Sequence, residues 1–324
     1  MWGNRLGWSI SAAIAIVVIG TITFYARGAS KVSDATPFGV EAAGQSLTLN
    51  ASAQAVIGGE PSACDAAGPY SEALAIYRKN QKTYDDIAGG STRVADLTKL
   101  PALMKLAEGT HCQQMTLFST DPSLVVRYGE SPDLEALLAL GKAAVRAGLI
   151  YRSEKKNFEA MKCYEAAFAL GAKLYDERMT YREMMAGQEL LGEAGVGISK
   201  LAFDTGKTDR TEAAQKLDTA RRNMFTQQVQ PTAQKLISID PQKVAHYAGD
   251  VFYVAENAKD RMWRVEAVFS LGRMRYFVGE NGRIGDQRGA ARKLRVLLND
   301  KDPIIRAAAK AALDLTPEQM RMLG

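Results

Sequence analysis

The chain has 324 residues, of which 47% are hydrophobic and 24% are charged, and its formal net charge is +5. This composition supports a packed core and excludes a wholly disordered chain. A net charge this small for the length gives no reason to expect nucleic acid as a partner.

The N-terminal segment predicts a single transmembrane helix over residues 1–27. Residues 6–26 contain no charged residue and, at about 1.5 Å per residue, they would span roughly 30 Å, the thickness of the hydrocarbon core. Trp8 and Tyr25 lie near its two ends, as interfacial anchors do. The alternative is a cleaved signal peptide, but the apolar run is long for a signal core and Arg27 stands at the candidate cleavage site.

The charges beside this segment hardly decide its orientation. Arg5 precedes it, and Arg27 and Lys31 follow it, so the positive-inside rule favours neither orientation clearly. A short N-terminal tail commonly stays in the cytoplasm, and high Ala and Gly usage suggests a bacterium. We therefore expect a bacterial cytoplasmic-membrane protein that contacts the lipid bilayer through residues 6–26 and carries its C-terminal domain on the periplasmic side.

Residues 28–63 predict a flexible linker. They are rich in Ala, Gly, Ser and Thr, and they contain two prolines. No helical period is visible, although a short extended piece at 45–56 is compatible with the sequence.

The three cysteines form no Cys-x-x-Cys pair, so zinc and redox motifs of that kind are absent. Cys64 and Cys112 lie in turn-rich sequence and would form a disulfide in an oxidising compartment. Three buried free thiols, including Cys163, are an equal alternative, because cysteine packs as a small hydrophobe and spacing alone does not show a pair.

From residue 64 onward, apolar residues recur at helical spacing. The segment 133–172 resembles a tetratricopeptide repeat. The small and aromatic positions of that family fall at the same spacings here, at Gly148, Tyr151, Ala160, Tyr164 and Ala167. The resemblance implies two antiparallel helices that approach closely at the small residues, with the tyrosine rings between neighbouring pairs.

The segment 262–314 is similar to a HEAT repeat. The motif begins with two leucines, which are followed by the run Asn-Asp-Lys-Asp-Pro that ends at Pro303. Two aliphatic residues, Arg306 and a series of alanines come next. Val265 and Ile305 are 40 residues apart, which is a HEAT period. Both resemblances imply stacked helix pairs with an extended binding face.

Together these patterns predict an all-α protein. The expected architecture is an irregular α-solenoid of stacked helix pairs, preceded by one transmembrane helix and the linker. Its parts are a domain similar to tetratricopeptide repeats over 64–240 and a region similar to HEAT repeats over 241–324.

Residues that usually carry catalysis are scarce. The chain has two histidines, His111 and His246, and it lacks a phosphate-binding P-loop and a Gly-x-Ser-x-Gly elbow. We expect no catalytic, cofactor or metal site.

Charge suggests one candidate surface. Residues 261–310 hold 12 basic and 5 acidic residues, so the local balance is 12 − 5 = +7. One interpretation is a basic face for an acidic partner or anionic lipid, and the other is a solvated helical surface. The candidate residues are Arg273, Arg275, Arg283, Arg288, Arg292 and Arg295.

These observations predict a membrane-anchored, non-catalytic scaffold or adaptor that binds a protein partner, itself membrane-associated, at the membrane surface. An accessory structural subunit of a multi-protein membrane complex is the alternative. An enzyme with an unrecognised site is a lower alternative.

Overall fold

The computed structural model describes residues 37–44, 49–90, 97–117, 132–237, 247–276, 289–316 and 318. Over these ranges the chain is mostly helical, in agreement with the all-α class. The expected transmembrane segment lies outside the described residues, as does the expected domain boundary at residue 240. None of the helices in the described ranges combines the length and the apolar character that a membrane crossing requires.

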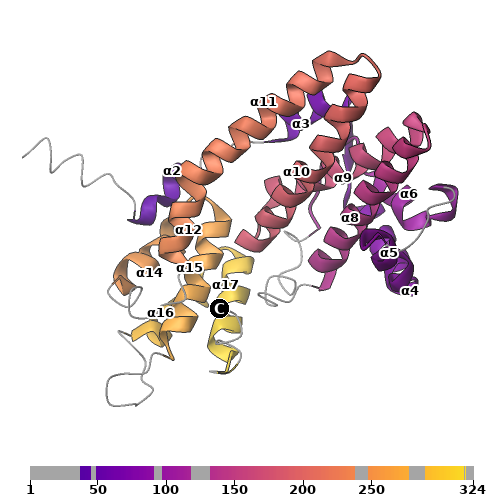
Figure 1. Cartoon of the computed structure of the whole chain (residues 1–324). Coiled ribbons are helices and arrows are strands. Elements are labelled where there is room, and N and C mark those ends of the chain that lie inside the picture. Colours follow the sequence, from indigo (N-terminus) through magenta and orange to yellow (C-terminus); the bar gives the residue numbers. More distant parts are fainter. Residues whose placement is uncertain are drawn as a thin grey trace, which may run out of the picture.

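The N-terminal half begins with short elements and continues into long helices (Figure 1). The short elements are η1 (Pro37–Gly39), α2 (Val40–Gly44), α3 (Leu49–Ile57), β1 (Ser62–Asp65), α4 (Ala67–Lys79), α5 (Gln81–Ala88), η2 (Leu97–Lys99), α6 (Pro101–Glu108) and β2 (Cys112–Gln114). Strands β1 and β2 form one parallel pair. The long helices are α8 (Pro132–Ser153), α9 (Asn157–Glu177), α10 (Tyr181–Asp204) and α11 (Thr208–Met224).

The C-terminal half is a second group of helices, at the lower left of Figure 1. A π-helical turn, η3 (Phe225–Val229), joins α11 to α12 (Gln230–Leu236), so one helical segment leads from the first half into the second. The remaining helices are α14 (Ala248–Asn257), α15 (Arg261–Met274), α16 (Ala290–Leu297) and α17 (Pro303–Asp314).

Close packing of α8, α9 and α10 depends on glycines that face a tyrosine. A Cβ atom on Gly148 of α8 would lie 2.6 Å from the Tyr164 ring, and one on Gly197 of α10 would lie 2.5 Å from it. The Tyr164 ring is therefore enclosed between two helices that carry no side chain at that point. This is the packing that the resemblance to a tetratricopeptide repeat implied, and Tyr151, Ala160 and Ala167 are also buried.

Helices α9 and α10 approach even more closely where Gly171 meets Gly187. A Cβ atom on Gly187 would lie 2.6 Å from the Gly171 carbonyl oxygen and 2.6 Å from the Tyr175 backbone nitrogen. Backbone touches backbone here, so no side-chain movement could make room for a larger residue.

The prediction of a linker over 28–63 is wrong for its described part. Leu49, Ala53, Val56 and Ile57 of α3 are buried against α9 and α11. Their spacing of 4, 3 and 1 is helical, but the intervening Ala, Ser and Asn residues gave the segment the composition of a linker. The extended piece considered at 45–56 is helical from residue 49.

Residues 37–44 and 49–57, which we call the N-terminal strap, contact both halves. Thr232 Oγ1 of α12 donates a hydrogen bond to the Phe38 carbonyl oxygen at 3.0 Å. At the other end of the strap, the Leu49 backbone N–H donates to Asp176 Oδ1 of α9 at 2.8 Å. The strap therefore ties the C-terminal half to the N-terminal half.

Helix α15 is the centre of the C-terminal half, and every residue from Met262 to Met274 is buried. A helix that is buried all round must satisfy its polar side chains internally. Arg264 does so by donating to the Ala255 carbonyl oxygen at 2.9 Å and by pairing with Asp300. Ser270 Oγ donates to the Leu236 carbonyl oxygen at 2.5 Å.

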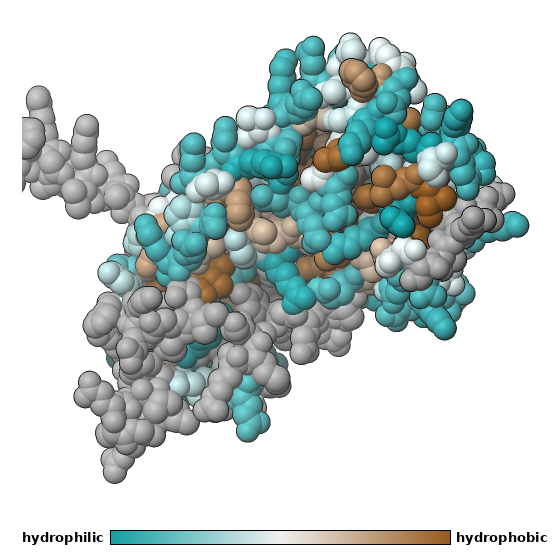
Figure 2. All heavy atoms as spheres, in the orientation of Figure 1, coloured by the Kyte–Doolittle hydropathy of each residue, from teal (hydrophilic) through white to brown (hydrophobic). Residues whose placement is uncertain are grey.

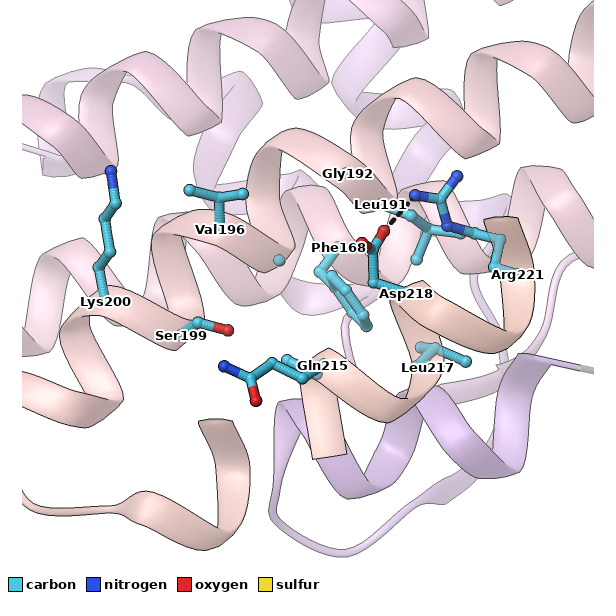
Figure 3. A pocket seen from close by; sticks show the side chains of 12 residues that line it. Phe168, Leu191, Gly192, Val196, Ser199, Lys200, Gln215, Leu217, Asp218 and Arg221 are labelled. Carbon is cyan, nitrogen blue, oxygen red and sulfur yellow. Dashed lines mark hydrogen bonds and ion pairs between the residues drawn. The ribbon is translucent and has the colours of Figure 1, made fainter. Parts of the chain in front are cut away.

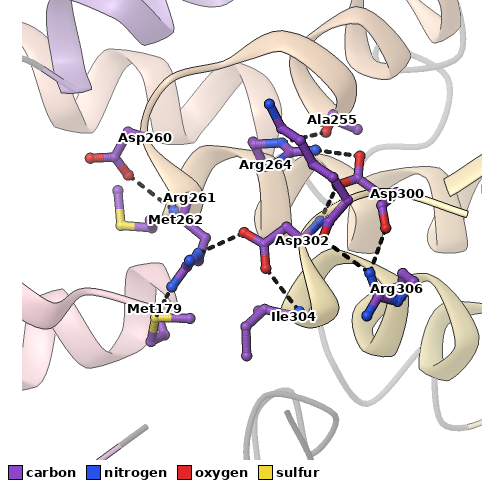
Figure 4. A network of polar contacts seen from close by, with 11 residues as sticks. Met179, Ala255, Asp260, Arg261, Met262, Arg264, Asp300, Asp302, Ile304 and Arg306 are labelled. Carbon is purple, nitrogen blue, oxygen red and sulfur yellow. Dashed lines mark hydrogen bonds and ion pairs between the residues drawn. The ribbon is translucent and has the colours of Figure 1, made fainter. Parts of the chain in front are cut away.

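The turn before α17 is held by a carboxylate network (Figure 4). Asp302 accepts a hydrogen bond from the Ile304 backbone N–H at 2.9 Å, and its other oxygen pairs with Arg261 at 2.8 Å. Asp302 is therefore the N-cap residue of α17 and also connects α17 to the start of α15. Arg306 closes the turn by donating to the Asp300 and Lys301 carbonyl oxygens.

Replacing Asp302 by alanine should lower the free energy of unfolding by about 1–2 kcal/mol, because the helix cap and a half-exposed ion pair are lost together. Urea unfolding of the purified protein measures this change. Asp302→Asn should recover most of it, since asparagine also caps helices. An alanine variant as stable as the native chain would contradict this role.

The two halves meet at the bend between α9 and α10. Arg178 Nε pairs with Asp260 Oδ2, the N-cap residue of α15, at 2.9 Å. The Tyr181 backbone N–H donates to the buried Glu266 of α15 at 2.8 Å. Glu183, also buried, accepts from the Met179 backbone N–H at 2.6 Å.

The bend should make stability depend on pH. Burial raises the pKa of the Glu183 carboxyl well above its usual value, and the Glu177 carboxylate raises it further, although two backbone hydrogen bonds oppose the shift. The folded state thus holds a proton that the unfolded state releases near pH 4.3. The contribution of this proton to stability should be fully present below that pH and be lost, by up to about 1.4 kcal/mol per pH unit, as pH rises toward the folded pKa.

Chemical unfolding between pH 4 and 8 tests this expectation. Glu183→Gln removes the titration but keeps an oxygen for the Met179 N–H, so its stability should be less dependent on pH and higher than native at pH 8. The exposed Glu212→Gln is the matched control, which should follow the native pH profile. If the stability of Glu183→Gln varies with pH as that of the native protein does, Glu183 is not the group that causes the pH dependence.

Candidate functional site

An open groove lies between α10 and α11 (Figure 3). It encloses about 250 Å³, and α9 contributes its floor through Phe168. Helix α10 supplies Leu191, Gly192, Gly195, Val196, Ser199 and Lys200, and helix α11 supplies Ala214, Gln215, Leu217, Asp218 and Arg221. We call this feature the α10–α11 groove.

The groove exists because α10 carries two glycines where it passes α11 and Phe168. A Cβ atom on Gly195 would lie 3.3 Å from Phe168 Cε2, and one on Gly192 would lie 3.7 Å from Arg221 Nη2. Without side chains at these two positions, the Phe168 ring and the apolar atoms of Leu191 and Leu217 line an indentation.

The edge of the groove carries side chains of both positive and negative charge. Arg221 is buried and pairs with Asp218, and it also donates to the Gln188 carbonyl oxygen at 3.4 Å. Arg222 Nε reaches the other Asp218 oxygen at 2.7 Å. Burial alone would raise the pKa of Asp218, but the hydrogen bonds from the two arginines hold it below its usual value. Lys200, on the opposite side, is exposed.

Val196 gives the groove an exposed apolar edge. Its side chain is 51% exposed, although it stands on a helix whose neighbouring Ala194, Gly197 and Ile198 are buried. Brown patches in Figure 2 show that apolar residues reach the surface over this half of the molecule. An apolar indentation with a polar edge is the usual form of a site that accepts one side chain of a partner.

The four described arginines of the predicted basic face do not act together. Arg273 is buried and donates to Ser270 Oγ at 2.8 Å. Arg275 donates to the Ala312 and Leu313 carbonyl oxygens at 2.8 and 2.6 Å, so it caps the last turn of α17. Arg292 and Arg295 are exposed on α16. Arg283 and Arg288 lie outside the described residues.

A basic face that includes Arg273 and Arg275 is therefore wrong, because both guanidinium groups are used inside the fold. Local charge could not reveal this, since arginine satisfies carbonyl oxygens as readily as it faces water. Only Arg292 and Arg295 remain as surface candidates among the described members of the set.

The structure joins Cys64 and Cys112 by a disulfide, which was one of the two alternatives from the sequence. The bond connects β1 to β2 and joins two cysteines that are 48 residues apart in the sequence. Cys163 is a buried free thiol, and burial raises its pKa to about 12.

The described ranges show no side-chain cluster that would support a metal site or a catalytic role for histidine. They contain no group of three or more His, Cys, Asp and Glu side chains placed to hold a metal ion. His111 lies beside Gly59, whose Cβ position would be 3.1 Å from the imidazole Cε1. His246 lies outside the described residues.

Sequence analysis did not find the α10–α11 groove. Phe168 lies in an apolar helical pattern that predicts a core residue. Gly192 and Gly195 are residue types that weaken a helix, and their positions alone do not indicate a binding site. Two glycines in one long helix are the signal that could have pointed to a close approach or an indentation.

No protein-family model, no curated protein and no solved structure matches this chain.

Proposed function

We propose that this protein is a non-catalytic scaffold or adaptor that binds a protein partner through the α10–α11 groove. In this proposal the helices form an irregular α-solenoid, residues 6–26 anchor it in a bacterial cytoplasmic membrane, and the helical body lies on the periplasmic side. The observation that supports partner binding is the open groove itself, with the buried Phe168 ring as its floor and the exposed Val196 at its edge.

The groove is suited to a helix or peptide segment with one large apolar side chain. A volume of about 250 Å³ accommodates a side chain such as leucine or phenylalanine but is small for a whole substrate. Lys200 on one side of the groove would orient a segment that carries an acidic residue beside its apolar anchor. A single buried apolar anchor surrounded by polar contacts is the energetic pattern of protein interfaces.

A Cys64–Cys112 disulfide also supports an exported body, because disulfides persist in oxidising compartments.

An accessory structural subunit of a membrane complex is the alternative function. It would use the same groove, but it would be unstable without its complex. Partner depletion would thus lower the cellular amount of a subunit and leave that of an adaptor unchanged.

The test is cross-linking in native membranes, followed by purification through a C-terminal tag and mass spectrometry. Val196→Glu should reduce the recovery of the main partner at least tenfold, because it places a charge on the apolar edge of the groove. Val296→Glu on α16 is the matched control, since Val296 is also 51% exposed and lies in the other half.

Equal recovery with both variants would reject the groove as the binding site. If the native protein is recovered alone from cross-linked membranes, the scaffold proposal itself fails. Circular dichroism of both variants ensures that a loss of recovery does not reflect unfolding.

A further inference from the structure

A second cavity, separate from the α10–α11 groove, lies where α3, β2 and α9 meet. It encloses about 650 Å³, within the usual range for small-ligand sites. Its walls are Ala53, Gln54 and Ile57 of α3, Pro61, Thr110, residues 112–114 of β2, and Ala169, Ala172 and Lys173 of α9. Its location depends on the packing of α3 against α9, which the sequence did not predict.

Lys173 is the only charged residue among the cavity walls in the described structure, and it is just 4% exposed. Its Nζ donates to the Thr110 carbonyl oxygen at 3.2 Å. An ammonium group has three N–H donors, and the structure gives this one no second acceptor among the described residues. A buried ammonium with unused donors in a cavity is a site for an anionic acceptor.

The surrounding elements contribute little opposing charge. Helix α3 and strand β2 contain no charged residue. Asp176 on α9 is the charged group that acts on Lys173, and it already accepts a hydrogen bond from the Leu49 N–H. Burial therefore outweighs Asp176 and lowers the pKa of Lys173 to about 8.

The uncharged part of the cavity wall combines apolar side chains with three glutamines. Gln54 uses its side-chain N–H groups on the Gly58 and Gly59 carbonyl oxygens, at 3.1 and 3.0 Å. Gln113 and Gln114 are exposed at the mouth. The disulfide at Cys112 fixes this wall to β1.

We propose that this cavity binds a ligand through a carboxylate group held by Lys173. One buried cation matches a single negative charge, whereas a phosphate dianion would leave one charge uncompensated beside the buried ammonium. The carboxylate could belong to a free organic acid or to the C-terminus of a peptide, and these two sources differ in what else must enter the cavity.

Saturation-transfer NMR on the full-length protein in detergent tests the proposal with inorganic phosphate, as a competitor, and three organic probes. The organic probes are hexanoate, the tripeptide Ala-Ala-Ala with a free C-terminus, and the same tripeptide with a C-terminal amide. Binding of hexanoate indicates a free acid. Binding of the free tripeptide without hexanoate and without the amide indicates a peptide terminus.

Either carboxylate should bind at least tenfold more weakly to Lys173→Met, since a charge-assisted hydrogen bond is lost. This variant should stay folded because it removes a buried charge and keeps the side-chain length. Lys162→Met is the matched control, because Lys162 lies on the same helix but not on the cavity wall. It should bind like the native protein.

Binding should also weaken by about tenfold per pH unit above pH ~8, where the free ammonium loses its proton. Absence of binding by both carboxylates, equal binding to Lys173→Met, or stronger binding of inorganic phosphate would each overturn the proposal.

Discussion

Replacing Gly187 by alanine should destabilise the protein by about 3 kcal/mol or more, although only one methyl group is added. The added carbon would lie 2.6 Å from the Gly171 carbonyl oxygen and from the Tyr175 backbone nitrogen. Neither atom belongs to a side chain that could rotate away, so α9 and α10 would have to separate. Since these helices form the most extensive contact in the described fold, the loss should spread along both.

Thermal and urea unfolding measure the effect. Gly249→Ala in α14 is the matched control, because no atom lies within 4 Å of the position of its Cβ. Alanine favours helix over glycine by about 1 kcal/mol in a helix interior, so this variant should be neutral or slightly more stable. Equal stability of the two variants would show that α9 and α10 do not pack through Gly171 and Gly187.

The second large effect concerns the disulfide. Replacing Cys64 and Cys112 together by alanine should lower the free energy of unfolding by about 4 kcal/mol, which is the chain-entropy value for a loop of this length. The unfolded chain gains the conformations that the bond excludes. The parallel pair of β1 and β2 is short and would lose its covalent connection.

A reducing agent provides the matched measurement. It should lower the stability of the native protein toward that of the double variant and leave the double variant unchanged. Cys163→Ala retains the disulfide and should keep the native response to reduction. A native protein whose stability does not change on reduction would contradict a structural role for this bond.

Sequence patterns predicted the helices that pack through small residues. The resemblance to a tetratricopeptide repeat pointed to Gly148, Tyr151 and Tyr164, and the structure encloses the Tyr164 ring between α8 and α10. The run that ends at Pro303, which carried the resemblance to a HEAT repeat, also contains a local signal for a helix start, because an aspartate followed by proline begins α17. The first prediction follows from a repeat pattern within one helix pair and the second from adjacent residues, so both signals lie within a short stretch of sequence.

The failures concern contacts between residues far apart in sequence. Leu49 of α3 hydrogen-bonds to Asp176, 127 residues away, and no local pattern encodes that partner. Arg275 caps α17 through the Leu313 carbonyl oxygen, 38 residues away, so its charge was misread as surface charge. The α10–α11 groove likewise requires Phe168 from one helix and Gly195 from the next.

Incorporation of residues 37–44 and 49–57 into the helical body limits how far that body can travel from a bilayer. If residues 6–26 span the membrane as proposed, only residues 27–36 remain between the span and Pro37. Ten residues reach at most about 35 Å when fully extended. The body would therefore sample a thin layer next to the lipid surface, where a membrane-bound partner meets it at high effective concentration and a soluble partner gains no such advantage.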